Sequence, residues 1–295
     1  IWSNVPNITL NGGAFVSNSF GEIGAITMNN GTITQSGGYL RAWGGWTLSG
    51  NNTINVSSYI NIDGSGIYSG FFNVLSGTTT ISGVVGQGGN GVNAIGFTKN
   101  GTGTLVLTGA NSWGGGTGNA KLNAGTLVLN NNTALGNNIF TINGGTLDIF
   151  GTGNAAIGAL AGSGGVITDT GFQLGSSVLS TYSVASSAYA GSINDGNFRT
   201  LSLYKDGTGI LALTGASTYS GVTKIFEGAL SIGNNTALGT SVGETIVSSG
   251  AAVQVTGGIT SAEAFTVSGT GLSATSGVLQ NLSGDNTLSG AITVT

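Results

Sequence analysis

A long internal repeat dominates this sequence. Residues 99–136 read KNGTGTLVLTGANSWGGGTGNAKLNAGTLVLNNNTALG, and residues 205–239 read KDGTGILALTGASTYSGVTKIFEGALSIGNNTALG. Once residues 118–120 are treated as an insertion, 35 positions align and 20 of them are identical. Because internal similarity of this kind is the signature of a repeat architecture, we expect the chain to be built from stacked copies of one structural unit.

Large aliphatic residues alternate with variable ones inside each copy. Leu105 and Leu107 align with Leu211 and Leu213, while the residue between them changes from Val to Ala. A second equivalent set is Leu127 and Leu129, with Leu230 and Ile232. Alternation with period 2 is typical of a strand with one buried face and one solvated face. Each run is therefore predicted to be a short strand.

Similar short apolar runs recur outside the two copies and are separated by Gly and Asn, which tolerate positive φ at corners. The additional predicted strands are residues 8–10, 26–28, 147–149 and 253–255. Sandwiches and barrels need no repeated sequence, whereas a solenoid buries an apolar face only by stacking its turns. With about 20 to 25 residues per turn, residues 1–295 are expected to form one all-β solenoid domain of roughly 12 to 15 turns.

The composition excludes several classes of protein. There is no His and no Cys, so His-dependent or Cys-dependent catalysis and thiolate metal sites are impossible. Six Lys and Arg residues in a chain of net charge −4 leave no basic surface for nucleic acid. No apolar run is long enough for a membrane helix. The chain starts at Ile1, without an export signal, and is expected to be a segment of a longer precursor.

The repeated pattern K-x-G-T-G-x-L-x-L-T-G-A, followed by an aromatic residue, x-G-x-L and N-N-T-A-L-G, resembles the passenger-associated transport repeat of autotransporters. The resemblance is close over residues 99–136 and 205–239 and fades before about residue 70. It implies a right-handed parallel β-helix that is exported across the outer membrane and displayed or released at the cell surface. No translocator barrel follows the repeats within this sequence.

Carboxylates are the only side chains left for acid–base chemistry, and β-helices of other families include enzymes that use Asp or Glu pairs. The ten acidic residues are Glu22, Asp63, Asp148, Asp169, Asp195, Asp206, Glu227, Glu244, Glu263 and Asp285. Two pairs are separated by about one turn, namely Asp148 with Asp169 and Asp206 with Glu227. We expect all four to be solvated surface charges, and Lys205 and Lys224 to join the second pair in a weak surface network.

Aromatic residues beside Gly offer a possible contact surface, since aromatic side chains anchor many interfaces. The candidates are Trp2, Trp43, Trp46, Trp113 and Tyr219. Trp113 and Tyr219 are equivalent in the two copies and are expected to cover the apolar column at a corner. The pair Trp43 and Trp46 is the better interface candidate.

Polar runs and Gly clusters give weaker signals. The Asn runs at 130–132 and 234–235 are interpreted as turns, with stacked amide ladders as the alternative. Gly88 and its neighbours lack the Asp of a calcium-binding nonapeptide, and residues 101–103 and 114–116 are not followed by the helix and Lys of a phosphate loop.

The sequence as a whole predicts a non-enzymatic extracellular structural or adhesive β-helix, a passenger stalk or a filament subunit. No catalytic residue, cofactor or metal ligand is assigned. Expected partners are copies of itself or adjoining turns placed end to end, and surface glycans or host and abiotic surfaces. The alternative is a carbohydrate-binding or carbohydrate-cleaving β-helix, which requires a groove with two facing carboxylates.

Overall fold

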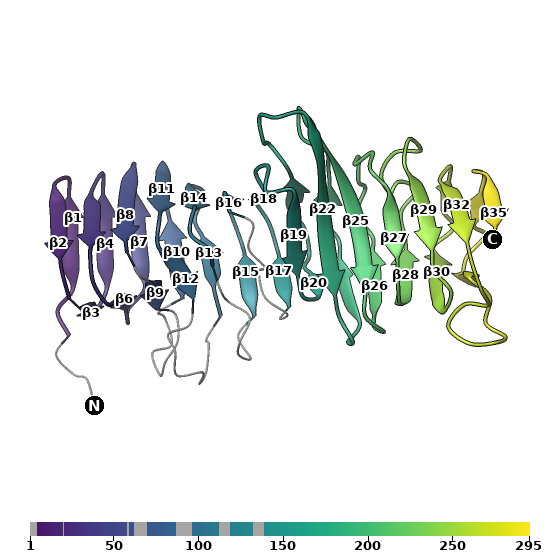
Figure 1. The fold of residues 1–295 in the computed structure, drawn as a ribbon, viewed down its shortest axis with the longest axis horizontal. Helices are drawn as coiled ribbons and strands as arrows, with labels where there is room; N and C mark the ends of the chain where they lie inside the picture. Colours follow the sequence, from purple (N-terminus) through teal and green to yellow (C-terminus); the bar gives the residue numbers. More distant parts are fainter. Residues whose placement is uncertain are drawn as a thin grey trace. The chain divides into compact units, whose positions relative to one another are not determined.

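The computed structural model describes residues 5–19, 21–57, 59–61, 70–86, 96–111, 119–131 and 139–295. The chain forms two compact units, unit 1 at Ile1–Asp148 and unit 2 at Ile149–Thr295, and each is described separately below. Every named element is a β-strand, and all of the strand pairings given below are parallel (Figure 1). No helix in the described residues is long and apolar enough to cross a membrane.

Unit 1 is built from three parallel sheets, and successive turns contribute one strand to each of the first two, while the third sheet has four strands. The first sheet contains β1 (Ile8–Asn11), β4 (Ile26–Asn29), β7 (Trp46–Ser49), β10 (Phe71–Val74), β13 (Thr98–Asn100), β15 (Ala120–Leu122) and β17 (Phe140–Ile142). The second contains β2 (Ala14–Ser17), β5 (Thr32–Gln35), β8 (Asn52–Val56), β11 (Thr78–Ile81), β14 (Thr104–Leu107), β16 (Thr126–Leu129) and β18 (Thr146–Asp148). The third contains β3 (Gly21–Ile23), β6 (Tyr39–Ala42), β9 (Tyr59–Asn61) and β12 (Val84–Gly86).

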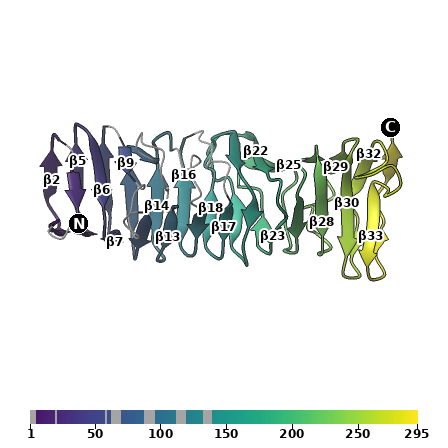
Figure 2. The ribbon, with the colours of Figure 1, turned by 90° about the horizontal axis from the view of Figure 1, so that it is seen from below.

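Unit 2 also consists of stacked parallel strands, and its two longest, β22 and β25, have eight residues each. One sheet contains β19 (Asn154–Ile157), β22 (Gly175–Tyr182), β25 (Arg199–Asp206), β27 (Thr223–Ile225), β29 (Glu244–Val247), β32 (Ala264–Val267) and β35 (Ile292–Val294). The next contains β23 (Ser187–Tyr189), β26 (Ile210–Leu213), β28 (Gly228–Ile232), β30 (Ala251–Thr256) and β33 (Leu279–Ser283), with β28, β30 and β33 side by side in Figure 2. The remaining short strands are β20 (Leu160–Ala161), β21 (Val166–Thr168), β24 (Ser192–Ile193), β31 (Thr260–Ser261) and β34 (Thr287–Leu288).

The predicted parallel β-solenoid is confirmed. Ile8 pairs with Ile26, 18 residues away, whereas Phe71 pairs with Thr98, 27 residues away. Turn length therefore varies more widely than the 20 to 25 residues used for the sequence estimate.

The alternating pattern is also confirmed. Leu105 pairs with Leu127, and Leu127 with Leu147, so equivalent leucines stack directly in adjacent turns. These leucines are fully buried, and the Val residues between them lie on the half-exposed face. Burying a Leu contributes roughly 1.5 to 3 kcal/mol, so the stacked aliphatic columns supply the main driving force for folding.

Two further ladders stabilise unit 1. The rings of Trp46 and Phe72 stack at 5.6 Å between centroids, and Phe97 continues the stack at 5.4 Å from Phe72. Outside the core, Asn143 Nδ2 donates to Asn123 at 2.9 Å and Asn123 Nδ2 donates to Asn100 at 2.8 Å, and Asn100 in turn donates to Asn73. The amide ladder that the sequence allowed therefore exists, but at positions that the Asn runs did not indicate.

Glycine is required at the corner before the second strand of each repeat copy. Gly125 has φ +70° and the equivalent Gly228 has φ +65°. A Cβ at Gly125 would clash with the carbonyl oxygens of Gly101 and Gly103, and one at Gly228 with the carbonyl oxygen of Gly209. Only a residue without a Cβ allows the turns to approach this closely.

Candidate functional site

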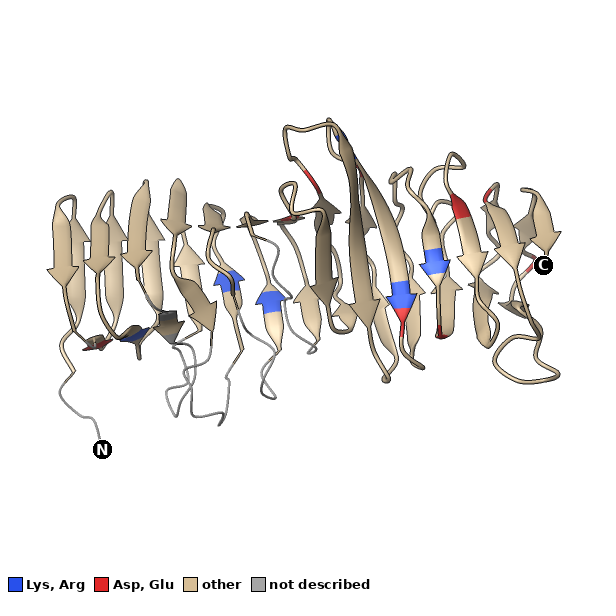
Figure 3. Cartoon of the chain, viewed as in Figure 1, with Lys and Arg blue, Asp and Glu red and all other residues tan. Residues whose placement is uncertain are grey.

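The structure places the predicted acidic pairs in different environments. Asp206 and Glu227 have exposed side chains, as expected for surface charges. Asp148 and Asp169 are buried, which corrects the expectation that they are solvated. Asp63 lies outside the described residues. Among the described residues of each unit, the charged residues are few and scattered (Figure 3).

Asp169 lies at the end of β21 and is held by four groups. Its Oδ1 accepts hydrogen bonds from the backbone N–H groups of Gly151 at 2.6 Å and Gly171 at 2.9 Å. Its Oδ2 accepts from the Ser177 hydroxyl and from Arg199 Nε at 2.9 Å. A buried carboxylate costs free energy unless it is paired and hydrogen-bonded in this way, so Asp169 is a structural anion and not a free acid.

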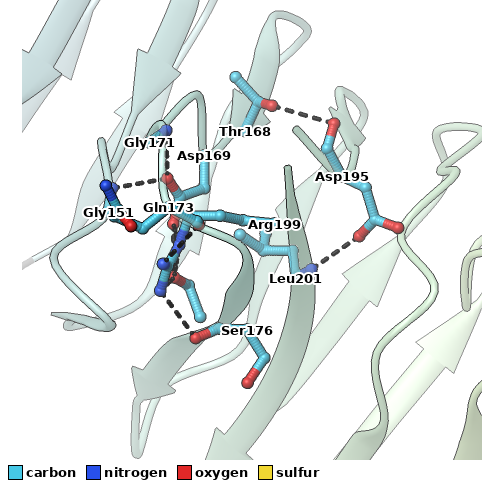
Figure 4. Close-up of polar contacts among 10 residues, drawn as sticks. Gly151, Thr168, Asp169, Gly171, Gln173, Ser176, Asp195, Arg199 and Leu201 are labelled. Atoms are coloured by element: carbon cyan, nitrogen blue, oxygen red, sulfur yellow. Dashed lines mark hydrogen bonds and ion pairs between the residues drawn. The ribbon is translucent and has the colours of Figure 1, made fainter. Parts of the chain in front are cut away.

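Arg199 uses the rest of its guanidinium group to hold the loop between β21 and β22 and the first residues of β22. Its Nη1 donates to the Gln173 carbonyl at 3.2 Å and its Nη2 donates to the Ser176 carbonyl at 2.9 Å (Figure 4). The planar guanidinium provides several donors in a fixed geometry. Arg199 therefore connects the Asp169 carboxylate to the backbone of a surface loop.

Asp195 holds the neighbouring loop in the same manner. Its Oδ1 accepts from the backbone N–H of Leu201 at 2.6 Å, and both carboxylate oxygens accept from the backbone N–H of Ser220 at 3.1 Å. The Thr168 hydroxyl donates to the Asp195 carbonyl at 3.2 Å (Figure 4). Two loops of unit 2 are thus fixed by buried or half-buried carboxylates.

Three apolar side chains on these held loops face solvent. Phe172 is 75% exposed, Leu174 is 85% exposed and Phe198 is 48% exposed. Leu174 and Phe198 immediately precede Gly175 and Arg199, which are register partners in β22 and β25. We call Phe172, Leu174 and Phe198 the apolar loop surface. Exposed apolar groups on ordered loops are characteristic of contact surfaces.

Lys205 is not part of a surface charge network, which corrects the prediction. Its side chain is buried, and Nζ donates to the carbonyl oxygens of Gly207 at 2.5 Å and Glu227 at 2.9 Å. The equivalent Lys99 is also buried and donates to the Gly101 and Ala124 carbonyls. Burial lowers the pKa of both lysines to about 8.

The aromatic residues that the sequence singled out differ in burial. Trp46 is fully buried in the core, so its assignment to an exposed interface was wrong, whereas the buried Tyr219 covers the core as expected. Trp43 is half-buried, and its Nε1 donates to Glu22 at 3.3 Å while the Arg41 guanidinium lies 4.7 Å from its ring. Trp2 and Trp113 lie outside the described residues.

The Asn runs form turns where they can be seen. Asn131 and Asn234 lie in bends and Asn235 in a turn. Asn234 accepts from the backbone of Thr236 within this segment, whereas Asn131 donates to the Thr108 carbonyl and Asn235 accepts from the backbone of Thr260 in adjacent coils. Asn132, the Gly88 segment and residues 114–116 lie outside the described residues. Within the described part of the chain, no group of three or more acidic side chains is arranged to hold a metal ion.

Sequence reasoning missed Arg199 and the role of the repeat lysines for different reasons. Arg199 is the first residue of β25 and lies outside both aligned repeat copies, so no repeat signal identified it. Lys99 and Lys205, in contrast, are identical in both copies. That identity was a usable signal, because a surface charge need not be kept in two copies.

Comparison with known proteins connects this solenoid to a family. The passenger-associated-transport-repeat family matches residues 97–117, 120–149 and 203–232. The adhesin BmaC autotransporter of Brucella suis biovar 1 (strain 1330) is 31% identical over 212 residues, which cover 70% of this chain and 5% of that protein. No solved structure matches. The chain therefore carries passenger-associated transport repeats, the family that residues 99–136 and 205–239 resemble.

Proposed function

We propose that this chain is a non-enzymatic stalk segment of an autotransporter passenger at the bacterial cell surface, and that it takes part in adhesion. The passenger repeats carry this proposal, and the similarity to a protein described as an adhesin supports it. The chain spans about 5% of that relative. A solenoid of stacked turns supplies length and stiffness without any active site.

The environment of the carboxylates supports a structural role over catalysis. A hydrolase of this fold needs two carboxylates free to act on opposite sides of one bond. Asp169 is fully engaged with Arg199, Ser177 and backbone N–H groups. Asp206 lies on the surface and accepts a hydrogen bond from the backbone of Gly207 at 2.8 Å.

The apolar loop surface is the proposed adhesive contact. Phe172 also packs edge-on against Phe150, with ring centroids 5.4 Å apart. This contact restricts the motion of one of the three exposed side chains. Side chains that are already ordered lose less conformational entropy when they bind. Hydrophobic contact by Phe172, Leu174 and Phe198 would then supply most of the adhesive energy.

Adhesion is tested with beads coated with the purified chain and applied under flow to a cultured epithelial monolayer. We expect more beads to be retained than with albumin coating, and retention to fall at least fivefold for the triple variant Phe172→Ser, Leu174→Ser, Phe198→Ser. Val16→Ser is the matched control, because Val16 is 74% exposed in unit 1. Retention equal to that of albumin beads would refute the adhesive role.

Location is tested separately in a bacterium that produces the complete precursor. An antibody against this chain should label intact cells, and mild protease treatment should remove the label. Labelling only after permeabilisation would contradict surface display.

We also propose end-to-end stacking, either on adjoining turns of the same polypeptide or on another copy. Parallel pairing with the preceding turn, as between β32 and β35, supports it because the same backbone pattern can be continued by a further strand. Electron microscopy of native material tests the second case. Long filaments would support a filament subunit, whereas single rods attached to membrane would leave the stalk role alone.

A further inference from the structure

A cavity of about 310 Å³ in unit 2 is not used by the proposed adhesive surface. One wall is the N-N-T-A-L-G turn of the second repeat copy, including Thr236 and Leu238, together with Thr240 directly after it. The other wall is the segment from Ser261 to Glu263. Its volume is at the lower end of the range for pockets that bind small molecules.

The polar groups of this cavity are incompletely satisfied by the protein. Glu263 is 4% exposed, and its Oε1 accepts a hydrogen bond from the Thr245 hydroxyl at 2.9 Å. The Thr240 Oγ1 atom is buried and has no hydrogen-bond partner. A buried hydroxyl without a partner costs free energy, so a bound molecule that supplies the missing hydrogen bond would be stabilised.

Buried hydroxyl groups on two adjacent strands accompany the Thr245 contact to Glu263. The Tyr219 hydroxyl and the Thr223 hydroxyl lie 2.6 Å apart, and Thr223 is the register partner of Thr245 in β27 and β29. All three side chains are fully buried. The Glu263 carboxyl group is therefore positioned by the core, as expected for a preformed polar site.

The lining selects one class of ligand. No Lys, Arg or aromatic side chain lines the cavity, so neither an anion nor a stacked planar ring is favoured. A single carboxyl group is too few ligands for a typical divalent cation site. Hydroxyl groups on Thr236, Thr240 and Ser261, together with Glu263, offer both donors and acceptors to a neutral molecule with several hydroxyl groups.

We propose that this cavity binds one neutral sugar residue, with Thr240 and Glu263 as its principal hydrogen-bonding groups. The inference does not depend on the apolar loop surface, and either proposal can fail alone. The sugar is either a free monosaccharide or the terminal residue of a glycan chain, since both present the same hydroxyl groups.

Nuclear magnetic resonance titration of the isotope-labelled chain tests the site. The probes are D-glucose, D-galactose and N-acetyl-D-glucosamine, each also as the terminal residue of a disaccharide. We expect saturable shifts of the backbone amides of residues 235–241 and 261–263 with at least one probe. Binding of the disaccharide as tightly as the monosaccharide indicates a glycan terminus, and loss of binding indicates a free sugar.

Thr240→Val separates binding from structure, because it removes the unpartnered hydroxyl and keeps the shape of the side chain. We expect the affinity to fall about tenfold while the stability of the free protein is unchanged or higher. Thr208→Val, at an exposed position, is the control. The proposal is overturned if no probe gives localised saturable shifts, or if Thr240→Val binds as tightly as the wild type.

Discussion

Lys99 and Lys205 make the same three hydrogen bonds in the two repeat copies. Each Nζ donates to the carbonyl oxygens one and two residues ahead and to one in the following turn, Ala124 for Lys99 and Glu227 for Lys205. The third acceptor is 25 residues ahead in the first copy and 22 in the second. The difference equals the three-residue insertion 118–120, so the contact is preserved in space across the insertion.

Lys99→Met tests the importance of this contact. The substitution keeps most of the aliphatic stem but leaves three carbonyl groups without their donor, and we expect the free energy of unfolding to fall by about 3 kcal/mol. The measurement is urea unfolding followed by circular dichroism. Lys121→Met is the control, because Lys121 is exposed one turn away, and it should change stability by less than about 0.5 kcal/mol. Equal losses would mean that the carbonyl contact contributes little.

The sequence was sufficient for the parts of the fold that repeat. Leu105 and Leu211 are equivalent positions in the two copies, and both alternate with variable residues. Both are buried, because stacked turns impose the same environment on the same position of each copy. Lys205 was misjudged for a physical reason: a cation is usually solvated, and only the fold shows which carbonyl groups replace water around it. Asp169 and Arg199 could not be paired, because a 30-residue separation across two loops has no period to reveal it.

The Asp169–Arg199 ion pair gives a second prediction. Asp169→Asn alone leaves the Arg199 charge unpaired, and Arg199→Met alone leaves the Asp169 charge unpaired and removes the loop contacts. Each single variant should lower the free energy of unfolding by about 3 to 5 kcal/mol. The double variant should cost clearly less than the sum of the two, because no unpaired charge remains buried. Urea unfolding gives these values, and limited proteolysis reports whether the loop at residues 170–176 opens.

Asp206→Asn is the control for this ion pair, since Asp206 is exposed and should tolerate the change. Strict additivity of the two single variants would show that Asp169 and Arg199 stabilise the fold independently. Unchanged proteolysis in Arg199→Met would show that the guanidinium does not order the loop.

Alanine substitution at two glycines with positive φ distinguishes the cost of backbone strain from the cost of a steric clash between adjacent turns. Gly228 has φ +65° and Gly250 has φ +85°, but a Cβ would meet carbonyl oxygens only at Gly228, and nothing lies within 4 Å at Gly250. Gly250→Ala should cost about 1 kcal/mol for the left-handed conformation. Gly228→Ala should cost at least about 2 kcal/mol more, because adjacent turns must also separate. Equal losses of unfolding free energy would mean that the turns adjust freely.

The pH dependence of stability reports on Glu263. Burial raises the pKa of Glu263 to about 7, the hydrogen bond from Thr245 opposes this shift, and the nearby Glu244 raises the pKa further. The unfolded chain therefore loses this proton near pH 4.5, whereas the folded chain keeps it until about pH 7. Because the unfolded state binds fewer protons between these values, stability falls as pH rises from about 4.5 to 7, by about 3 kcal/mol.

Glu263→Gln should abolish this contribution, because the amide stays neutral at every pH. The measurement is the difference in unfolding free energy between wild type and variant from pH 4.5 to pH 8, which cancels the contribution of carboxylates common to both. We expect the variant to gain stability relative to wild type as pH rises, and the difference to level off above about pH 7. A difference independent of pH would show that Glu263 is ionised in the folded chain at acidic pH, and that the cavity presents a carboxylate throughout this range.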